Sequence, residues 1–179
     1  PKNAGGFDNT RAQQTLEDLR AAIAFAQLAR PQQLVLVGAS LGGMMTAKAA
    51  GAAQASAVVI LAAPAELPAF DFRVEPAELQ ALTMPKLVIG SEQDSTVPFA
   101  DTQRLYDLAP EPKELHSYPG SAHGVQLLGG AEAGDLAARL IDFIVAHTAA
   151  AGSAAPALAV SAAEQSARRE DLRYLAEQL

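Results

Sequence analysis

The chain has 179 residues, half of them hydrophobic and 18% charged, a balance typical of a globular domain with its own core. Its net charge of −7 argues against a nucleic-acid partner, because a phosphate-binding surface needs clustered lysine and arginine, and the absence of cysteine excludes disulfides, thiolate metal sites and a cysteine nucleophile. No apolar stretch reaches the roughly 18 residues that a membrane span requires, so we expect none.

The first part of the chain alternates helical and strand-like patterns. Residues 1–9 are rich in glycine and asparagine and predict a loop, whereas residues 10–30 carry leucine and isoleucine at helical spacing. The apolar run at 34–37 (LVLV) is typical of a strand buried on both faces of a parallel sheet. A glycine-rich turn at 38–43 then leads into a predicted helix over 44–53.

The alternation continues to residue 147. Short apolar runs predict three more strands, at 57–62, 86–90 and 114–118. Two more helices are predicted, over 98–109 and 131–147. Residues 63–84 contain several prolines and predict a loop or small insertion with at most a short helix. Strands that alternate with helices indicate an α/β fold, in which a parallel sheet is flanked by helices.

The chain is predicted to contain one domain and a tail. The domain covers residues 1–148. Residues 149–160 are mostly alanine, glycine, serine and proline, a composition typical of a linker. Residues 161–179 predict a C-terminal helix with a narrow leucine stripe.

The segment Gly38-Ala39-Ser40-Leu41-Gly42 matches the pattern G-x-S-x-G between a predicted strand and a predicted helix. In that context the serine occupies a strained turn and its hydroxyl is lifted out at the carboxyl end of the sheet. Gly38 and Gly42 lack Cβ atoms, which would let strand and helix approach closely. The backbone N–H of Leu41 would then stabilise an oxyanion. The alternative is an ordinary serine in a glycine-rich turn, although the pattern should occur by chance only about 0.06 times in such a chain.

A serine nucleophile needs an adjacent base, and the chain offers three histidines. His116 lies within a predicted strand, and His147 lies near the end of a helix. His123 lies in a glycine-containing loop after a strand and is the best candidate; otherwise it is an exposed loop histidine. Two carboxylates, Glu92 and Asp94, follow the strand at 86–90, and the loop position favours Asp94. The alternative for Asp94 is a turn cap.

Three segments resemble the α/β-hydrolase serine hydrolases: LVLVGASLGGMM, MPKLVIGSEQDSTVP and YPGSAHG. They occur in the family's order of serine, acid and histidine, and the resemblance extends over residues 10–147. It implies that Ser40 is the nucleophile, His123 the general base and Asp94 the acid that orients it. It also implies hydrolysis of a small-molecule carboxylic ester, or a related acyl bond, through an acyl-enzyme without a cofactor.

The sequence departs from this family before residue 10. The family has further strands there, and one of their loops supplies a second oxyanion N–H, so this chain corresponds to the C-terminal half of the fold. We therefore expect the strand at 34–37 to present an open edge that favours self-association. We also expect residues 1–179 alone to be nearly inactive. A cytoplasmic location is expected, and periplasmic or secreted locations stay open because the chain begins at Pro1.

Other functions fit parts of the pattern. An acyltransferase or thioesterase would use the same three residues, and a non-catalytic binding module could share the fold, although a binder does not need all three. A dinucleotide site is disfavoured because residues 38–43 lack G-x-G-x-x-G, and a metal site because there is no cysteine and no paired histidine. The short segment 63–84 leaves no room for a large lid and favours small or medium esters.

Overall fold

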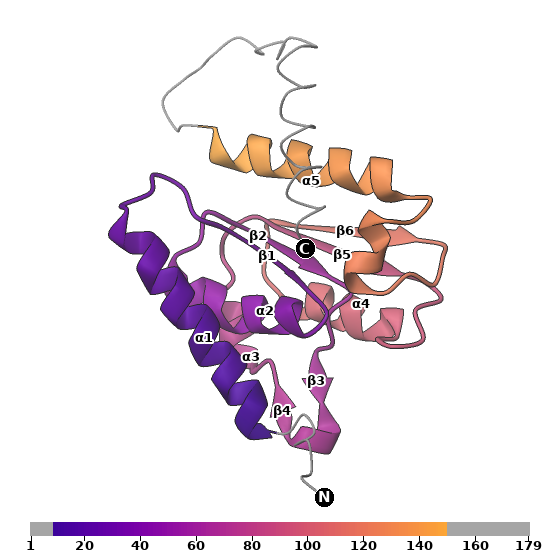
Figure 1. Ribbon diagram of the computed structural model, residues 1–179, viewed down its shortest axis with the longest axis horizontal. Coiled ribbons are helices and arrows are strands. Elements are labelled where there is room, and N and C mark those ends of the chain that lie inside the picture. Colours follow the sequence, from indigo (N-terminus) through magenta and orange to yellow (C-terminus); the bar gives the residue numbers. More distant parts are fainter. Residues whose placement is uncertain (1–8, 150–179) are drawn as a thin grey trace, which may run out of the picture. The chain divides into compact units, whose positions relative to one another are not determined.

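Four parallel strands form the central sheet of the computed structural model, which describes residues 9–149. Their order is β1 (Val35–Ala39), β2 (Ala57–Leu61), β5 (Lys86–Ser91) and β6 (Lys113–Tyr118) (Figure 1). All three pairings are parallel, which confirms the predicted α/β class with a parallel sheet. Because every strand runs the same way, the loops after the four carboxyl ends gather at one edge of the sheet.

Helices cover both faces of this sheet. α5 (Ala133–Thr148) lies on one face, and α1 (Asn9–Leu28) and α2 (Leu41–Ala53) lie on the other, together with α4 (Phe99–Leu108) (Figure 1). The predicted linker, apart from its first residue, and the predicted C-terminal helix lie outside the described residues. Within residues 9–149, no helix combines the length and apolar character needed to cross a membrane.

The strand β2 shows why a continuous apolar run forms the centre of such a sheet. All five of its residues are buried. Val58 and Ile60 pack toward α1 and α2, whereas Val59 and Leu61 pack toward α5. Each such side chain contributes about 1.5–3 kcal/mol on burial. A strand with one polar face could not pack against the helices on both sides of the sheet.

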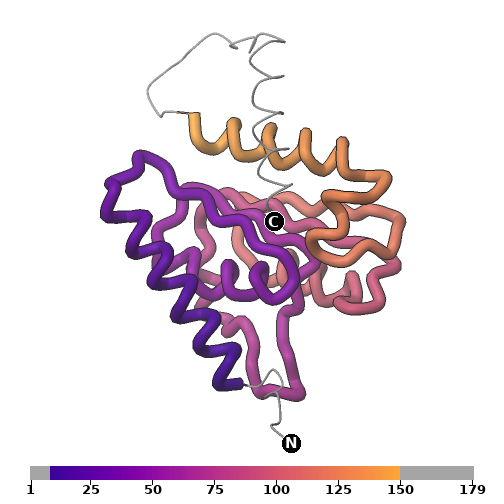
Figure 2. Tube along the Cα trace, in the orientation of Figure 1, coloured from indigo at the N-terminus to yellow at the C-terminus, as the bar shows by residue number. Residues whose placement is uncertain are grey.

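Residues 66–80 contain a hairpin that the sequence analysis missed. β3 (Glu66–Leu67) pairs antiparallel with β4 (Phe72–Arg73) across the 3-10 turn η1 (Pro68–Phe70), and the short helix α3 (Pro76–Gln80) follows. The hairpin extends away from the sheet on the side of α1 and α2 (Figure 2). The expected short helix is present, but two-residue strands are too short to produce a recognisable alternation.

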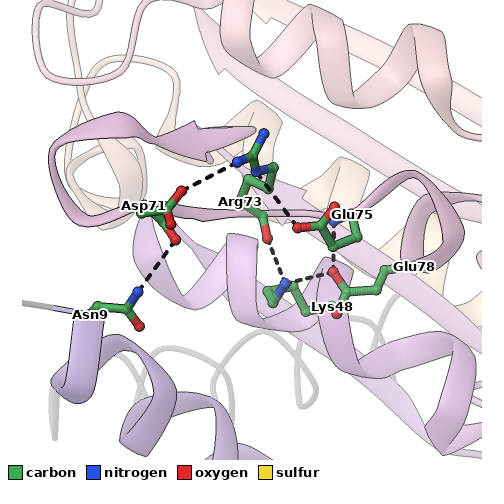
Figure 3. Close-up of polar contacts among 6 residues, drawn as sticks. All are labelled: Asn9, Lys48, Asp71, Arg73, Glu75 and Glu78. Carbon is green, nitrogen blue, oxygen red and sulfur yellow. Dashed lines mark hydrogen bonds and ion pairs between the residues drawn. The ribbon is translucent and has the colours of Figure 1, made fainter.

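This hairpin is held by a lysine of α2. The ammonium group of Lys48 donates to the backbone carbonyl of Arg73 and, at 2.6 Å, to the carboxylate of Glu78 (Figure 3). The same ammonium lies 5.0 Å from the centroid of the Phe72 ring. On the other strand of the hairpin, Glu66 forms an ion pair with Arg104 of α4 at 3.0 Å. Contacts with α2 and α4 therefore add to the pairing within the hairpin itself.

The two edges of the sheet differ in chemistry. β6 carries Lys113, Glu114 and His116, and charged edge strands resist pairing with another chain. β1 reads VLVGA without a charge, pairs only with β2 among the described strands, and leaves Val37 51% exposed. The open edge expected from the sequence is thus present in the described residues, and self-association through it stays a prediction.

We predict that Val37→Lys shifts residues 1–179 from oligomers toward monomer in sedimentation velocity. A lysine on the edge strand would have to be desolvated when two edges pair. The matched control is Val145→Lys, which changes a valine that is 40% exposed on α5. Equal sedimentation of wild type and Val37→Lys would contradict the edge as the contact.

The first residue of β5 is a buried lysine. Lys86 is 1% exposed, and its ammonium donates to the carbonyls of Pro110 at 2.6 Å and Pro112 at 2.9 Å. These bonds tie the loop before β6 to the amino end of β5. Burial lowers the pKa of Lys86 to about 8; the nearby charge of Lys113 lowers it further, while that of Glu111 opposes the shift.

We predict that Lys86 makes stability depend on pH between about 8 and 10. In that window the unfolded chain still binds the proton that the folded protein has released, so the free energy of unfolding contributed by this group rises with pH. Lys86→Met removes the titration, so the stability advantage of wild type over this variant should grow with pH in urea unfolding. A difference that is constant from pH 8 to pH 10 would contradict this prediction.

Candidate active site

Ser40 joins the last residue of β1 to the first residue of α2. Its backbone has φ 53° and ψ −124°, a conformation that side-chain-bearing residues rarely adopt. Its N–H donates to the carbonyl of Leu61 at 2.8 Å, and its carbonyl accepts from the N–H of Met44 at 3.1 Å. The strand on one side and the helix on the other therefore hold the turn in its strained form.

Close backbone packing at this turn depends on two glycines. A Cβ atom at Gly38 would lie 2.3 Å from the carbonyl oxygen of Gly42 and 2.5 Å from Oγ1 of Thr46. The expectation that Gly42 also needs to lack a Cβ is wrong, because an added Cβ there would meet no described atom within 4 Å. The second crowded position is Gly43, where a Cβ would lie 2.7 Å from Cβ of Ala63. In α2, the third residue, Gly43, therefore faces the sheet, whereas the second residue, Gly42, does not.

His123 lies between the serine and the acid that the sequence analysis selected. Its Nε2 atom is 2.8 Å from Oγ of Ser40, and its Nδ1 atom is 2.7 Å from Oδ2 of Asp94. A carboxylate only accepts hydrogen bonds, so Nδ1 carries the proton and Nε2 is left to accept from the serine hydroxyl. The imidazole is 18% exposed and the carboxylate 1% exposed.

Asp94 combines two tasks that the sequence analysis treated as alternatives. Its Oδ1 atom accepts from the N–H groups of Thr96 at 2.8 Å and Val97 at 3.1 Å, which caps the turn after β5. Its Oδ2 atom is thereby directed to His123. The rival carboxylate, Glu92, accepts instead from the hydroxyl of Ser117 at 2.7 Å.

The loop that carries the histidine is fastened to the carboxyl end of β5. The hydroxyl of Ser91 donates to the carbonyl of Ala122 at 2.6 Å. Gln93 donates twice, from its backbone N–H to the carbonyl of Gly120 at 3.1 Å and from its side chain to that of Pro119 at 2.8 Å. Neither Ser91 nor Gln93 was predicted as a positioning residue, although polar residues directly after a buried strand are a signal for such a role.

Two further features complete the site around Ser40. Gly124 has φ +54°, and a Cβ there would lie 3.6 Å from Cβ of Ser40, so its backbone rests against the tight turn at residues 38–42, hereafter the elbow. Leu41 is the first residue of α2, and its N–H has no acceptor within the helix. The positive end of the helix dipole is directed to the same place, so an anion formed beside Ser40 would be stabilised there.

The other two histidines lie elsewhere. His116 stacks edge-on against Tyr118 of β6, and His147 lies in the last turn of α5 against Phe143. Burial lowers the pKa of His116, and Arg139 adds to the shift. Burial also raises the pKa of Tyr118 to about 12, as does its hydrogen bond to Asp135. Tyr118 and His116 of β6 both contact the carboxylate of Asp135 in α5, at 2.8 and 3.8 Å, whereas the contact between His147 and Phe143 lies within α5.

A cleft of about 330 Å³ lies between β6 and α5, and none of Ser40, His123 and Asp94 lines it. Ser40 therefore lies outside this concavity. Within residues 9–149, no three or more His, Cys, Asp or Glu side chains gather as a metal ion would require.

Comparison with solved structures shows the same fold in known proteins. The esterase domain of a Rhodothermus marinus protein is 22% identical, with a TM-score of 0.57; the alignment covers 73% of this chain and 67% of that one. An α/β serine hydrolase homologue from Coxiella burnetii is also 22% identical, with a TM-score of 0.59 and coverage of 79% and 63%. An esterase from Pyrococcus furiosus is 14% identical, with a TM-score of 0.66 and coverage of 82% and 67%.

This chain thus spans about two thirds of the length of these structures. No curated protein matches it. The family model described as "Serine hydrolase" matches residues 8–112, which is more than half of the chain and includes the elbow and the acid loop. The chain therefore belongs to the serine hydrolase family and has the α/β-hydrolase fold.

Proposed function

We propose that this serine hydrolase cleaves small carboxylic esters through Ser40, His123 and Asp94. The observation that carries the proposal is the continuous hydrogen-bonded chain from Oγ of Ser40 through both nitrogens of His123 to Oδ2 of Asp94. Serine is a poor nucleophile at neutral pH, and a base 2.8 Å from its oxygen is what activates it.

The proposed reaction uses this geometry in two steps. As Oγ of Ser40 attacks the ester carbonyl, Nε2 of His123 takes the hydroxyl proton. The tetrahedral intermediate then expels the alcohol, which receives that proton from Nε2. Water repeats the sequence on the acyl-enzyme, releases the acid and restores Ser40. Asp94 keeps its negative charge throughout and stabilises the imidazolium.

Charge on the carbonyl oxygen is stabilised by the N–H of Leu41 at the start of α2. A preorganised donor of this kind contributes about 3–4 kcal/mol in the transition state, equivalent to about 10²–10³ in rate. The backbone of Ser40 fixes this N–H beside the nucleophile, so no rearrangement is needed when the charge forms.

Small or medium esters are the proposed substrates. Residues 66–80 form only a short hairpin and a helix of five residues, so this segment contains no element the size of a lid. The structural neighbours from Rhodothermus marinus and Pyrococcus furiosus are described as esterases, which supports an ester over other acyl compounds.

We predict that a fluorophosphonate probe labels Ser40 and that Ser40→Ala abolishes labelling. The reagent reacts only with a serine whose proton is removed by a neighbouring base. Intact-mass analysis measures the adduct, and peptide mapping locates it. Ser56→Ala is a matched control, since that hydroxyl lies at the amino end of the sheet, where it accepts from the N–H of Leu34, and its loss should leave labelling unchanged. An adduct on the Ser40→Ala protein would contradict the assignment.

We predict that Asp94→Asn lowers kcat by up to about 10⁴ without unfolding the protein. An asparagine can still accept from Thr96 and Val97 through its oxygen and so preserve the turn, but its amide N–H₂ then faces Nδ1 and favours the wrong histidine tautomer. Ester hydrolysis and thermal unfolding are measured on the same samples. Glu92→Gln is the control and should change kcat little; a larger loss from Glu92→Gln would reassign the acid.

A further inference from the structure

The residues directly after His123 form a short helix with apolar side chains on two sides. η2 spans Gly124–Leu128, and Leu127 is fully buried in the core beside Leu136. Val125 and Leu128 are 68% and 44% exposed. In a 3-10 helix, residues three apart eclipse each other, so these two side chains form a single outward ridge.

Folding does not account for this ridge. Leu127 and the core around it fix η2, and the N–H of His123 is held by the side chain of Gln126 at 3.0 Å. Scattered apolar residues on a surface are ordinary, but Val125 and Leu128 share one face of one helical turn. Val125 also adjoins the reacting groups: it follows Gly124, whose backbone rests against Ser40, and its Cα lies at most about 7.6 Å from that of His123. Leu128 continues the same face one helical turn further on.

The chemistry of the proposed reaction decides which part of a substrate this ridge meets. Nε2 of His123 gives its proton to the departing alcohol, so the alcohol half of the ester must lie on the imidazole side of Ser40. The carbonyl oxygen lies toward the N–H of Leu41, and the acyl group takes the remaining direction. The element that continues from the histidine therefore lies on the side of the leaving group.

We propose that Val125 and Leu128 form the subsite for the alcohol half of the substrate, and that this alcohol is apolar. The inference rests on the proposed function and extends it by naming the substrate class: esters of alkyl or aryl alcohols rather than of sugars or charged alcohols. Contact with the ridge removes apolar surface of both partners from water, which stabilises the transition state together with the ground state.

The test compares two series of esters on wild type, Val125→Ser, Leu128→Ser and the double variant. One series keeps the acetyl group and lengthens the alcohol from methyl to butyl to hexyl. The other keeps methanol and lengthens the acyl group over the same range. Released acid is titrated to obtain kcat/KM. Controls are Val145→Ser on α5 and Leu108→Ser on α4, where the native side chains are 40% and 48% exposed.

Each single variant should lower kcat/KM for butyl and hexyl acetate about tenfold and leave methyl acetate within about twofold, because the lost contact involves about one or two methyl groups. The acyl series and both controls should be unaffected. If the variants instead lowered kcat/KM for the longer acyl esters, or left kcat/KM for the alcohol series unchanged, the inference would be overturned. The proposed function would then stand as long as wild type hydrolyses these esters. Hydrolysis that survives Ser40→Ala, or a fluorophosphonate probe that leaves Ser40 unlabelled, would overturn the proposed function and this inference with it.

Discussion

The contact between Asp94 and His123 is the interaction on which the arrangement of the site depends. A carboxylate that is 1% exposed would be costly without partners, and this one has three: two backbone N–H groups on Oδ1 and the imidazole on Oδ2. The backbone bonds fix the plane of the carboxylate, so that Oδ2 is directed to Nδ1 of His123. The histidine is thus oriented by the turn after β5 as well as by the contacts that hold its own loop.

Strand order explains why so many contacts serve one histidine. Ser40 follows β1, whereas Asp94 and His123 follow β5 and β6, and β2 lies between the two groups. The loop after β6 must therefore cross back over the carboxyl ends of β5 and β2 to place Nε2 beside Ser40. Ser91 and Gln93 hold this loop at three carbonyls along its way, and Gly124 lets the backbone settle on the elbow. A parallel sheet brings the three residues to one edge, and these hydrogen bonds hold the loop after β6 where His123 reaches Ser40.

The parts of the molecule that could be predicted are those whose structure is determined by residues close together in the sequence. A run such as AVVIL forms a strand because both of its faces are buried, and the G-x-S-x-G pattern identifies the turn because few other structures require it. The β3–β4 hairpin escaped prediction because Lys48, distant in sequence, holds it, and no property of its own two-residue strands shows this. The prediction that Gly42 must lack a Cβ was wrong for a related reason. Which glycine of α2 faces the sheet depends on the angle at which the helix leaves Ser40, and it is Gly43 that lies against Ala63.

The strained elbow connects stability to reactivity. Holding Ser40 at φ 53° costs of order 1–3 kcal/mol, which a loop in solvent could not sustain. Here a hydrogen bond to Leu61 of β2 and another from Met44 of α2 oppose any relaxation, and both elements are buried along most of their length. Relaxation would move Oγ away from Nε2 and turn the N–H of Leu41 away from the same point. The buried strand and helix thus stabilise a backbone conformation that is unfavourable by itself. The same conformation places Oγ of Ser40 beside Nε2 of His123 and the N–H of Leu41, the arrangement that the proposed reaction requires.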